Sequence, residues 1–285
     1  MTGLAVSVPS AVLDLPWPFE REYMQLALLA GVVVGACAPL IGVFLVQQRM
    51  ALLGDGIGHL AFAGVAAGLL LEVWPVWTAL LVAAGGALVI QWLRRRGTAT
   101  GDLALALIFY GGIALGVVLI SRAGAGSVDI LPYLFGSILT VEPGDVRVVV
   151  VIGIVIVASI ALLGRVLLAS VLDEEAARVA GLPVDAVGSL LAVLTAVTVV
   201  AAMRVVGVLL VAALMVLPVA SSRLIARSFR STVLVAVAVG VVSVVVGLVA
   251  ARQWALAPGG SIVLAATAAF GVTVAARGRG RMVRV

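Results

Sequence analysis

The sequence predicts an all-α membrane protein, a bundle of about eight to nine transmembrane helices with short re-entrant or half-helices, in a single domain over residues 1–285. Three observations predict this fold class. Hydrophobic residues make up 64% of the chain and charged residues only 11%, whereas about 25% of the residues of a soluble domain are charged. The apolar residues form runs of about 20, the length that crosses the hydrocarbon core of a bilayer. No stretch has the composition of a separate soluble domain.

The first half of the chain contains four predicted spans, at about residues 24–46, 54–71, 76–93 and 103–120. A lead-in over residues 1–23 lacks the basic start and continuous apolar core of a signal peptide, and it places Trp17 and Tyr23 near the headgroups. Glycines crowd the start of the second span, which predicts a weakened or unwound helix there. Glycines four residues apart, such as Gly64 and Gly68, predict a close approach between helices.

The second half begins with an apolar piece at 129–139, which is too short to cross and predicts a half-helix. A fifth span follows at about 146–163. The more polar stretch 164–185 contains acidic residues followed by Gly181 and Pro183, a pattern that predicts one short capped helix over 173–181. Segments 186–202 and 205–220 form either a tight hairpin or one broken helix with a re-entrant piece. The last two spans are at about 232–251 and 257–276.

Charge predicts the orientation. With nine spans and the N-terminus outside, most arginines fall on the cytoplasmic side together with the C-terminus, as topology in membranes demands. The arginine clusters at 94–96 and 277–284 are interpreted as topology signals. The net charge of +5 therefore reflects a partnership with the lipid bilayer and not with nucleic acid.

Asp55 and His59 are the predicted functional site. His59 is the single histidine of the chain, and a spacing of four residues places both side chains on one face of a helix. Burying a charged group in hydrocarbon costs roughly 2.5 to 3.5 kcal/mol on insertion scales, so such groups are functional candidates by default. The alternative is that Asp55 caps the second span and His59 bonds a neighbouring carbonyl.

The chain contains no lysine. It therefore lacks a P-loop lysine and a Schiff-base lysine, and any ATP hydrolysis by the Walker route belongs to a partner. The chain is predicted not to be an enzyme, because one histidine without a second intramembrane carboxylate leaves too few metal ligands and no general base. The lone Cys37 forms no intrachain disulfide.

Several motifs stand in a fixed order along the chain: Arg49-Met50, Gly54-Asp55 and His59; Tyr133-Leu134-Phe135-Gly136; Asp173-Glu174, Ala177 and Gly181-Leu182-Pro183; Arg204-Val205-Val206-Gly207-Val208-Leu209-Leu210; Leu217-Pro218 and Arg223-Leu224; and Pro258-Gly259. Together, over about residues 24–276, they resemble the ABC transporter permeases for zinc and manganese. The likeness covers most of the chain, and several motifs in the right order are far more specific than any one alone.

The resemblance implies a homodimeric permease of a prokaryotic plasma membrane, with two cytoplasmic ATP-binding subunits and an external metal-binding receptor protein. It implies no covalently bound cofactor; the divalent metal is cargo, and the partner uses ATP. In that family the residues that match Asp55 and His59 coordinate the metal. The helix that couples the permease to its ATPase maps to Asp173, Glu174, Glu175, Ala177, Arg178 and Gly181, with Ala176, Ala177 and Val179 expected to offer apolar contacts.

Two departures from the family pattern bear on the metal. Gly58 stands where Ser or Ala is usual, and the run after His59 lacks the proline of many manganese members. These departures favour zinc first and manganese second.

Other readings stay open from the sequence: a manganese or iron(II) permease, a siderophore or corrinoid permease, and an ion-coupled secondary transporter. The last would need coupling-ion ligands beyond Asp55 and His59, and few are present. For Arg204, anchoring of backbone carbonyls, snorkelling to the outer interface and a role in transport are all possible.

Overall fold

The computed structural model describes residues 16–96, 101–123, 130–208 and 210–282. All the regular secondary structure within these residues is helical. The lead-in over 1–15 and Asp129 lie outside the described residues. In chain order the helices are α1 (Glu22–Gln47), α2 (Leu53–Leu70), α3 (Pro75–Arg95), α4 (Gly101–Ala123), α5 (Leu131–Phe135), α6 (Pro143–Leu172), α7 (Glu174–Val179), α8 (Val184–Ala202), α9 (Val211–Ile225), α10 (Phe229–Trp254) and α11 (Pro258–Met282).

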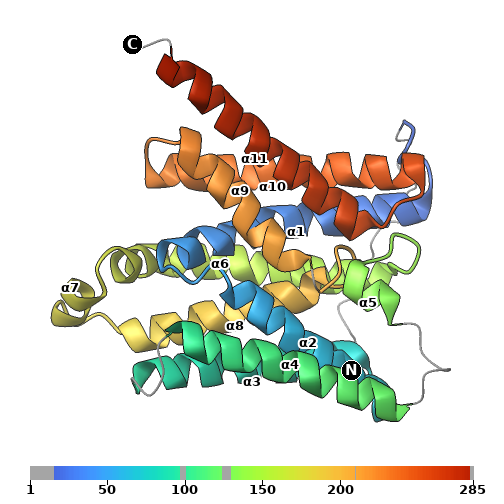
Figure 1. Ribbon diagram of the computed structural model, residues 1–285, viewed down its shortest axis with the longest axis horizontal. Helices are drawn as coiled ribbons and strands as arrows, with labels where there is room; N and C mark the ends of the chain where they lie inside the picture. The colour runs from blue at the N-terminus through green and yellow to red at the C-terminus, as the bar shows by residue number, and fades with distance from the viewer. Residues whose placement is uncertain (1–15, 97–100, 124–129, 209, 283–285) are drawn as a thin grey trace, which may run out of the picture.

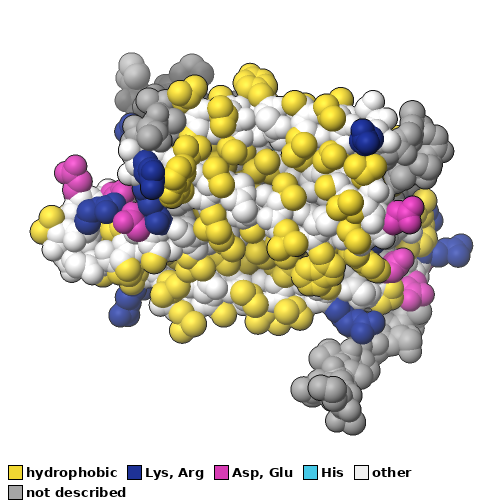
Figure 2. Space-filling model, turned by 90° about the horizontal axis from the view of Figure 1, so that it is seen from below, with side chains coloured by type: hydrophobic (Ala, Val, Ile, Leu, Met, Phe, Trp, Pro, Cys, Tyr) yellow, Lys and Arg dark blue, Asp and Glu magenta, His cyan; other side chains and the backbone are white. Residues whose placement is uncertain are grey.

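Eight helices are long and apolar enough to cross a membrane, and the apolar α9 is shorter, at 15 residues. This confirms the predicted all-α fold class and the predicted number of spans. The long helices lie side by side and successive ones alternate in direction, with α7 at one end of the bundle and α5 at the other (Figure 1). Charged side chains gather at the two ends of the face seen in Figure 2, and the middle is apolar. Large apolar side chains such as Leu81 on α3 and Leu162 on α6 are exposed, as a hydrocarbon environment requires.

The start of α2 is a regular helix, so the expectation of an unwound start is wrong. The glycines there serve close packing instead. A Cβ on Gly54 would lie 3.0 Å from the sulfur of Met215 on α9, and one on Gly58 would lie 2.9 Å from the carbonyl oxygen of Val208. Small residues let helix backbones approach in membranes, and this approach holds the first turns of α2 against the 203–210 turn and α9.

Segments 186–202 and 205–220 are separate helices, α8 and α9, and the second returns towards the end from which the first came (Figure 1). The two helices barely contact each other, because α9 packs mainly against α1, α10 and α11, so they form neither the tight hairpin nor a single broken helix. The turn between the helices is buried, with Met203, Val206 and Val208 among its enclosed side chains.

Two other elements differ in length from their predictions. The half-helix predicted at 129–139 is reduced to the five residues of α5. The residue that follows the helix, Gly136, has a φ of +75°. Conversely, α6 extends to Leu172 instead of ending near 163, because an apolar run resumes after Gly164 and Arg165. Asp173 then ends α6 and begins α7.

The predicted close approach at Gly64 is confirmed and leads to a test. A Cβ on Gly64 would lie 2.5 Å from the Cα of Ala79 on α3, whereas one on Gly85 would meet nothing within 4 Å. Gly64→Ala should therefore destabilise the chain by about 1–3 kcal/mol, as overpacking does, and lower its unfolding midpoint in detergent. Gly85→Ala is the matched control and should not lower it. Equal midpoints for the two variants would show that α2 and α3 do not pack in this way.

Candidate functional site

Asp55 and His59 both lie on α2, in its first two turns. The distance from Asp55 Oδ1 to His59 Nε2 is 3.8 Å, which is too long for a direct hydrogen bond. The side chain of Asp55 is 34% exposed and that of His59 is 15% exposed. The ring of His59 contacts Phe109 of α4 edge to face, with the ring centroids 4.4 Å apart. The pair is thus a partly enclosed carboxylate and imidazole on one helix face, as the spacing predicts.

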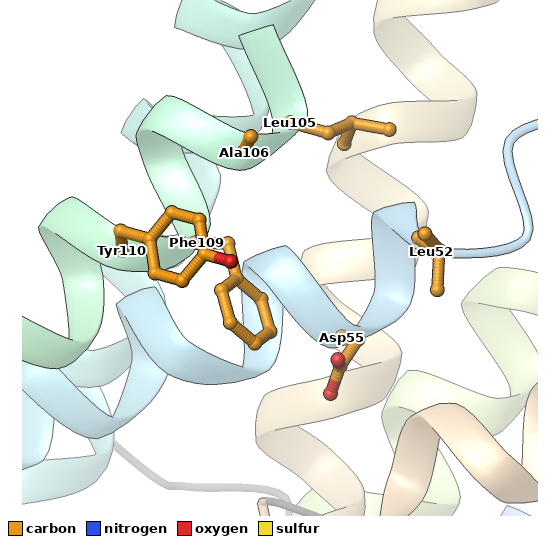
Figure 3. A pocket seen from close by; sticks show the side chains of 6 residues that line it. All are labelled: Leu52, Asp55, Leu105, Ala106, Phe109 and Tyr110. Atoms are coloured by element: carbon orange, nitrogen blue, oxygen red, sulfur yellow. The ribbon is translucent and has the colours of Figure 1, made fainter. Parts of the chain in front are cut away.

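A cavity of about 280 Å³ opens beside Asp55, between the start of α2 and α4. Its lining residues are Leu52, Asp55, Leu105, Ala106, Phe109 and Tyr110 (Figure 3). The carboxylate of Asp55 and the ring of Phe109 extend in the same direction from the two helices (Figure 3). Asp55 is the one charged group of an otherwise apolar or aromatic lining, so the cavity favours a cation over an anion or a neutral solute.

The backbone that carries the pair is held from both sides. Gly112 of α4 packs against the main chain of His59, and a Cβ there would lie 3.0 Å from the His59 carbonyl carbon. On the other side Gly58 meets the carbonyl of Val208. Neither contact leaves space for a side chain, so α2 presents its two ligand candidates from a fixed helix and not from a loop.

A complete set of metal ligands is not found in one chain. Within the residues that the structure describes, no group of three or more His, Cys, Asp and Glu side chains comes together. Protein zinc sites use three or four ligands of the chain, and Asp55 and His59 supply two. The remaining ligands of a bound ion would have to be water, backbone oxygens or groups of another chain.

The short helix predicted over 173–181 is α7. Asp173 caps it by accepting a hydrogen bond from the amide of Ala176 at 2.9 Å, and Glu174 and Glu175 occupy the first turn. The helix ends in a Schellman arrangement, in which the amides of Gly181 and Leu182 donate to the carbonyls of Arg178 and Ala177. Gly181 has a φ of +79°, a conformation that favours glycine.

Ion pairs hold α7 against the start of α8. Arg178 forms ion pairs with Glu174 at 3.1 Å and with Asp185 at 3.3 Å. The hydrogen bond to Asp185, and after it the one to Glu174, raises the pKa of the Arg178 guanidinium. Ala177, expected to contact an ATPase, is buried against the protein instead, because it lies on the inner face of the helix. Val179 is 90% exposed and remains available to a partner.

An ion pair that the sequence did not predict ties the opposite end of the bundle together. Arg204 Nε donates to Asp145 Oδ1 at 3.2 Å, and the two side chains are only 17% and 13% exposed. The guanidinium also lies over the ring of Tyr133, 5.5 Å from its centroid. These contacts join the 203–210 turn to the first turn of α6 and to α5. Arg204 is therefore an anchor, but it holds a carboxylate and not the backbone carbonyls considered from the sequence.

The chain matches the model of the ABC 3 transport family over residues 20–277. It belongs to this family. Among its relatives, the manganese transport system membrane protein MntC of Halalkalibacterium halodurans is 32% identical over 87% of this chain and 85% of the relative. The high-affinity zinc uptake system membrane protein ZnuB of Haemophilus influenzae is 31% identical over 90% of this chain and 99% of the relative.

A solved structure supports the same membership. PsaBC from Streptococcus pneumoniae, determined in complex with a Fab, superposes with a TM-score of 0.80 and 31% identity. The match covers 89% of this chain and 91% of that chain. The protein is thus an ABC transporter permease of the divalent-metal family, a multi-pass membrane protein of a family of transporters and not of enzymes.

The Arg204–Asp145 pair gives a stability prediction. Removing one partner leaves an uncompensated charge in a largely enclosed place, so Arg204→Ala should lower the free energy of unfolding by on the order of 3 kcal/mol. Arg252→Ala removes an arginine that lies over Tyr23 and should cost less. Thermal unfolding of the single and double variants at 204 and 145 gives the coupling energy. A coupling near zero would contradict the anchoring role.

Proposed function

We propose that this chain is the permease subunit of an ATP-driven importer for a divalent metal ion, zinc first and manganese or iron(II) second. One observation carries the proposal: a carboxylate and an imidazole, Asp55 and His59, lie one helical turn apart on α2 with 3.8 Å between Oδ1 and Nε2, and Asp55 lines an otherwise apolar cavity. The membership of the ABC 3 transport family supports it, as do relatives named for manganese and for zinc.

The choice of zinc rests on ligand chemistry. Imidazole suits zinc, and an N/O site binds zinc more tightly than manganese in the usual order of divalent metals. The absence of the proline that follows the histidine in many manganese members favours the same ion. A carboxylate beside the imidazole also accepts manganese, which therefore remains the alternative.

The metal passes between two copies of this chain. One copy supplies two ligands, and a homodimer would bring two carboxylates and two imidazoles to a common path, the number that zinc coordinates in tetrahedral sites. Binding must be weak enough for the ion to leave, as in any conducting pathway. Pairing with a different permease chain is the outcome that would replace the homodimer.

A partner ATPase drives the cycle, because this chain has no lysine for a Walker site. The ATPase docks on α7 at the cytoplasmic end, and an external receptor delivers the ion at the α5 end. The N-terminus is outside and the C-terminus inside. This orientation is supported by the arginines at the end of α3, on the side of α7. One permease domain, covering the whole chain, carries both the path and the docking helix.

Loss of the imidazole tests the site. His59→Ala, and separately Asp55→Asn, should lower uptake of radioactive zinc by about tenfold or more, the factor that corresponds to 1.4 kcal/mol of lost interaction. The amount of permease in the membrane and its assembly with the ATPase should not change. Glu72→Gln, a carboxylate outside the pair, is the control. If His59→Ala takes up zinc at the wild-type rate, Asp55 and His59 have only a structural role. Uptake that survives loss of the ATPase would exclude an ABC importer.

Docking on α7 has its own test. Val179→Asp places a charge on the most exposed apolar side chain of α7 and should weaken co-purification of the ATPase by about tenfold or more, because apolar helix-in-groove contacts exclude charge. Leu71→Asp makes the same change at an exposed apolar position at the far end of α2, and it should leave co-purification unchanged. Equal retention of the ATPase by both variants would exclude the Val179 face as its docking surface.

A further inference from the structure

A polar cavity of about 610 Å³ lies at the end of the bundle that carries α7. It is enclosed by the last residues of α1, α3 and α6 together with α7 and the first turns of α8. Its volume falls within the range of about 300–1,000 Å³ that is usual for small-molecule sites. The lining is mainly polar, in contrast to the cavity beside Asp55. Nothing in the proposed path of the metal uses it.

The charge of this cavity is positive. Four arginines line it against two carboxylates, Glu174 and Asp185. Both carboxylates are already engaged: Asp185 pairs with Arg95 at 3.4 Å and with Arg178, and Glu174 pairs with Arg178.

The two other arginines of the lining are Arg49 and Arg94. Arg94 donates to Gln91 Oε1 at 3.3 Å and contacts the sulfur of Met50. Within the described residues neither Arg49 nor Arg94 makes an ion pair with a carboxylate. Two guanidinium groups in the lining are thus left without a counter-ion.

Ser170 gives an independent observation. It lines the same cavity, its residue is 6% exposed, and its buried hydroxyl has no hydrogen-bond partner among the described residues. Many serines and threonines in other helices of this chain bond a carbonyl three or four residues back, as Thr195 does to Leu191 at 2.7 Å. Leaving a buried hydroxyl without a partner is unfavourable, and a bound acceptor would satisfy it.

The depth of the cavity indicates its ligand. α6 has 30 residues, a length of about 45 Å at 1.5 Å per residue, which equals the thickness of a bilayer with its headgroup layers. Ser170 lies in the last turn of this helix, so the cavity is at the depth of the headgroups. Basic pockets between transmembrane helices on the cytoplasmic side are places where acidic lipid headgroups bind.

We propose that this cavity binds a phosphate group, held by Arg49 and Arg94 with Ser170 as an additional donor. Guanidinium groups match phosphate oxygens in geometry and charge. The phosphate would come from an acidic phospholipid of the surrounding leaflet or from free phosphate in solution. Arg94 and Arg95 then do more than set the topology. Arg96, which stacks on Trp92 at 4.4 Å, is not part of the lining. The inference does not depend on which ion is transported.

The test uses the full-length chain, purified in a neutral detergent and freed of lipid. Its thermal unfolding is measured with phosphatidylglycerol, with phosphatidylcholine, and with inorganic phosphate against chloride at equal ionic strength. Phosphatidylglycerol should raise the unfolding midpoint by about 2–4 °C or more, as a ligand of the folded state does. R49Q/R94Q should lose this shift relative to its own lipid-free midpoint. R96Q should keep it, and R49K/R94K, which retains both charges, should keep most of it.

Each result of this experiment either supports the phosphate site or overturns it. An equal shift with inorganic phosphate supports the site and identifies free phosphate as its source. A shift with phosphatidylglycerol alone supports the lipid. Equal shifts with phosphatidylglycerol and phosphatidylcholine, or an undiminished shift in R49Q/R94Q, overturn the proposal. If no phosphate compound shifts the wild type but R49Q/R94Q loses the ATPase on co-purification, the arginines bind acidic side chains of that partner and the phosphate site is excluded.

Discussion

Hydrocarbon offers no hydrogen-bond partner, so every polar group inside the membrane must find its partner within the protein. The backbone satisfies this requirement by forming helices throughout the membrane-spanning part. Most buried hydroxyls satisfy it locally, as when Thr198 bonds Leu194 and Ser243 bonds Val239 on their own helices, and Ser170 in the last turn of α6 is an exception. Asp55 and His59 are different, because their side chains are 3.8 Å apart, too far for a direct hydrogen bond, and Asp55 lines a cavity. Within the part of the chain that the structure describes, these two polar side chains are not used for hydrogen bonding, and they are the ones that we propose for transport.

Close packing around α2 is what makes such a pair usable. Glycines at 54 and 58 let the helix approach α9 and the 203–210 turn, and Gly112 brings α4 against the backbone of His59. The same turn is anchored at its beginning by Arg204 on Asp145. The site is thus held by backbone contacts and by an ion pair at the α5 end of the bundle, neither of which involves the side chains of Asp55 and His59.

Local patterns predicted the fold well. Runs of apolar residues locate the spans, although α6 extends to Leu172, past its predicted end. The ends of α7 follow from Asp173 and Gly181, whose capping contacts reach only a few residues along the chain. The start of α2 was wrongly expected to unwind. The sequence alone does not distinguish a glycine that weakens a helix from a glycine that allows a neighbouring helix to pack closely. The Arg204–Asp145 pair and the arginine cavity join segments far apart in sequence. Only the three-dimensional arrangement brings them together.

One carboxylate connects α7, the proposed docking helix, to α3. Asp185 bonds Arg178 of α7 and also Arg95, the last residue of α3. From there α3 runs the length of the bundle beside α2 and contacts it at Gly64 and Gly68. Asp185 therefore joins α7 to α3, and α3 lies against the helix that carries Asp55 and His59. In the proposed transport cycle, this series of contacts through Asp185 is the route from α7 to α2.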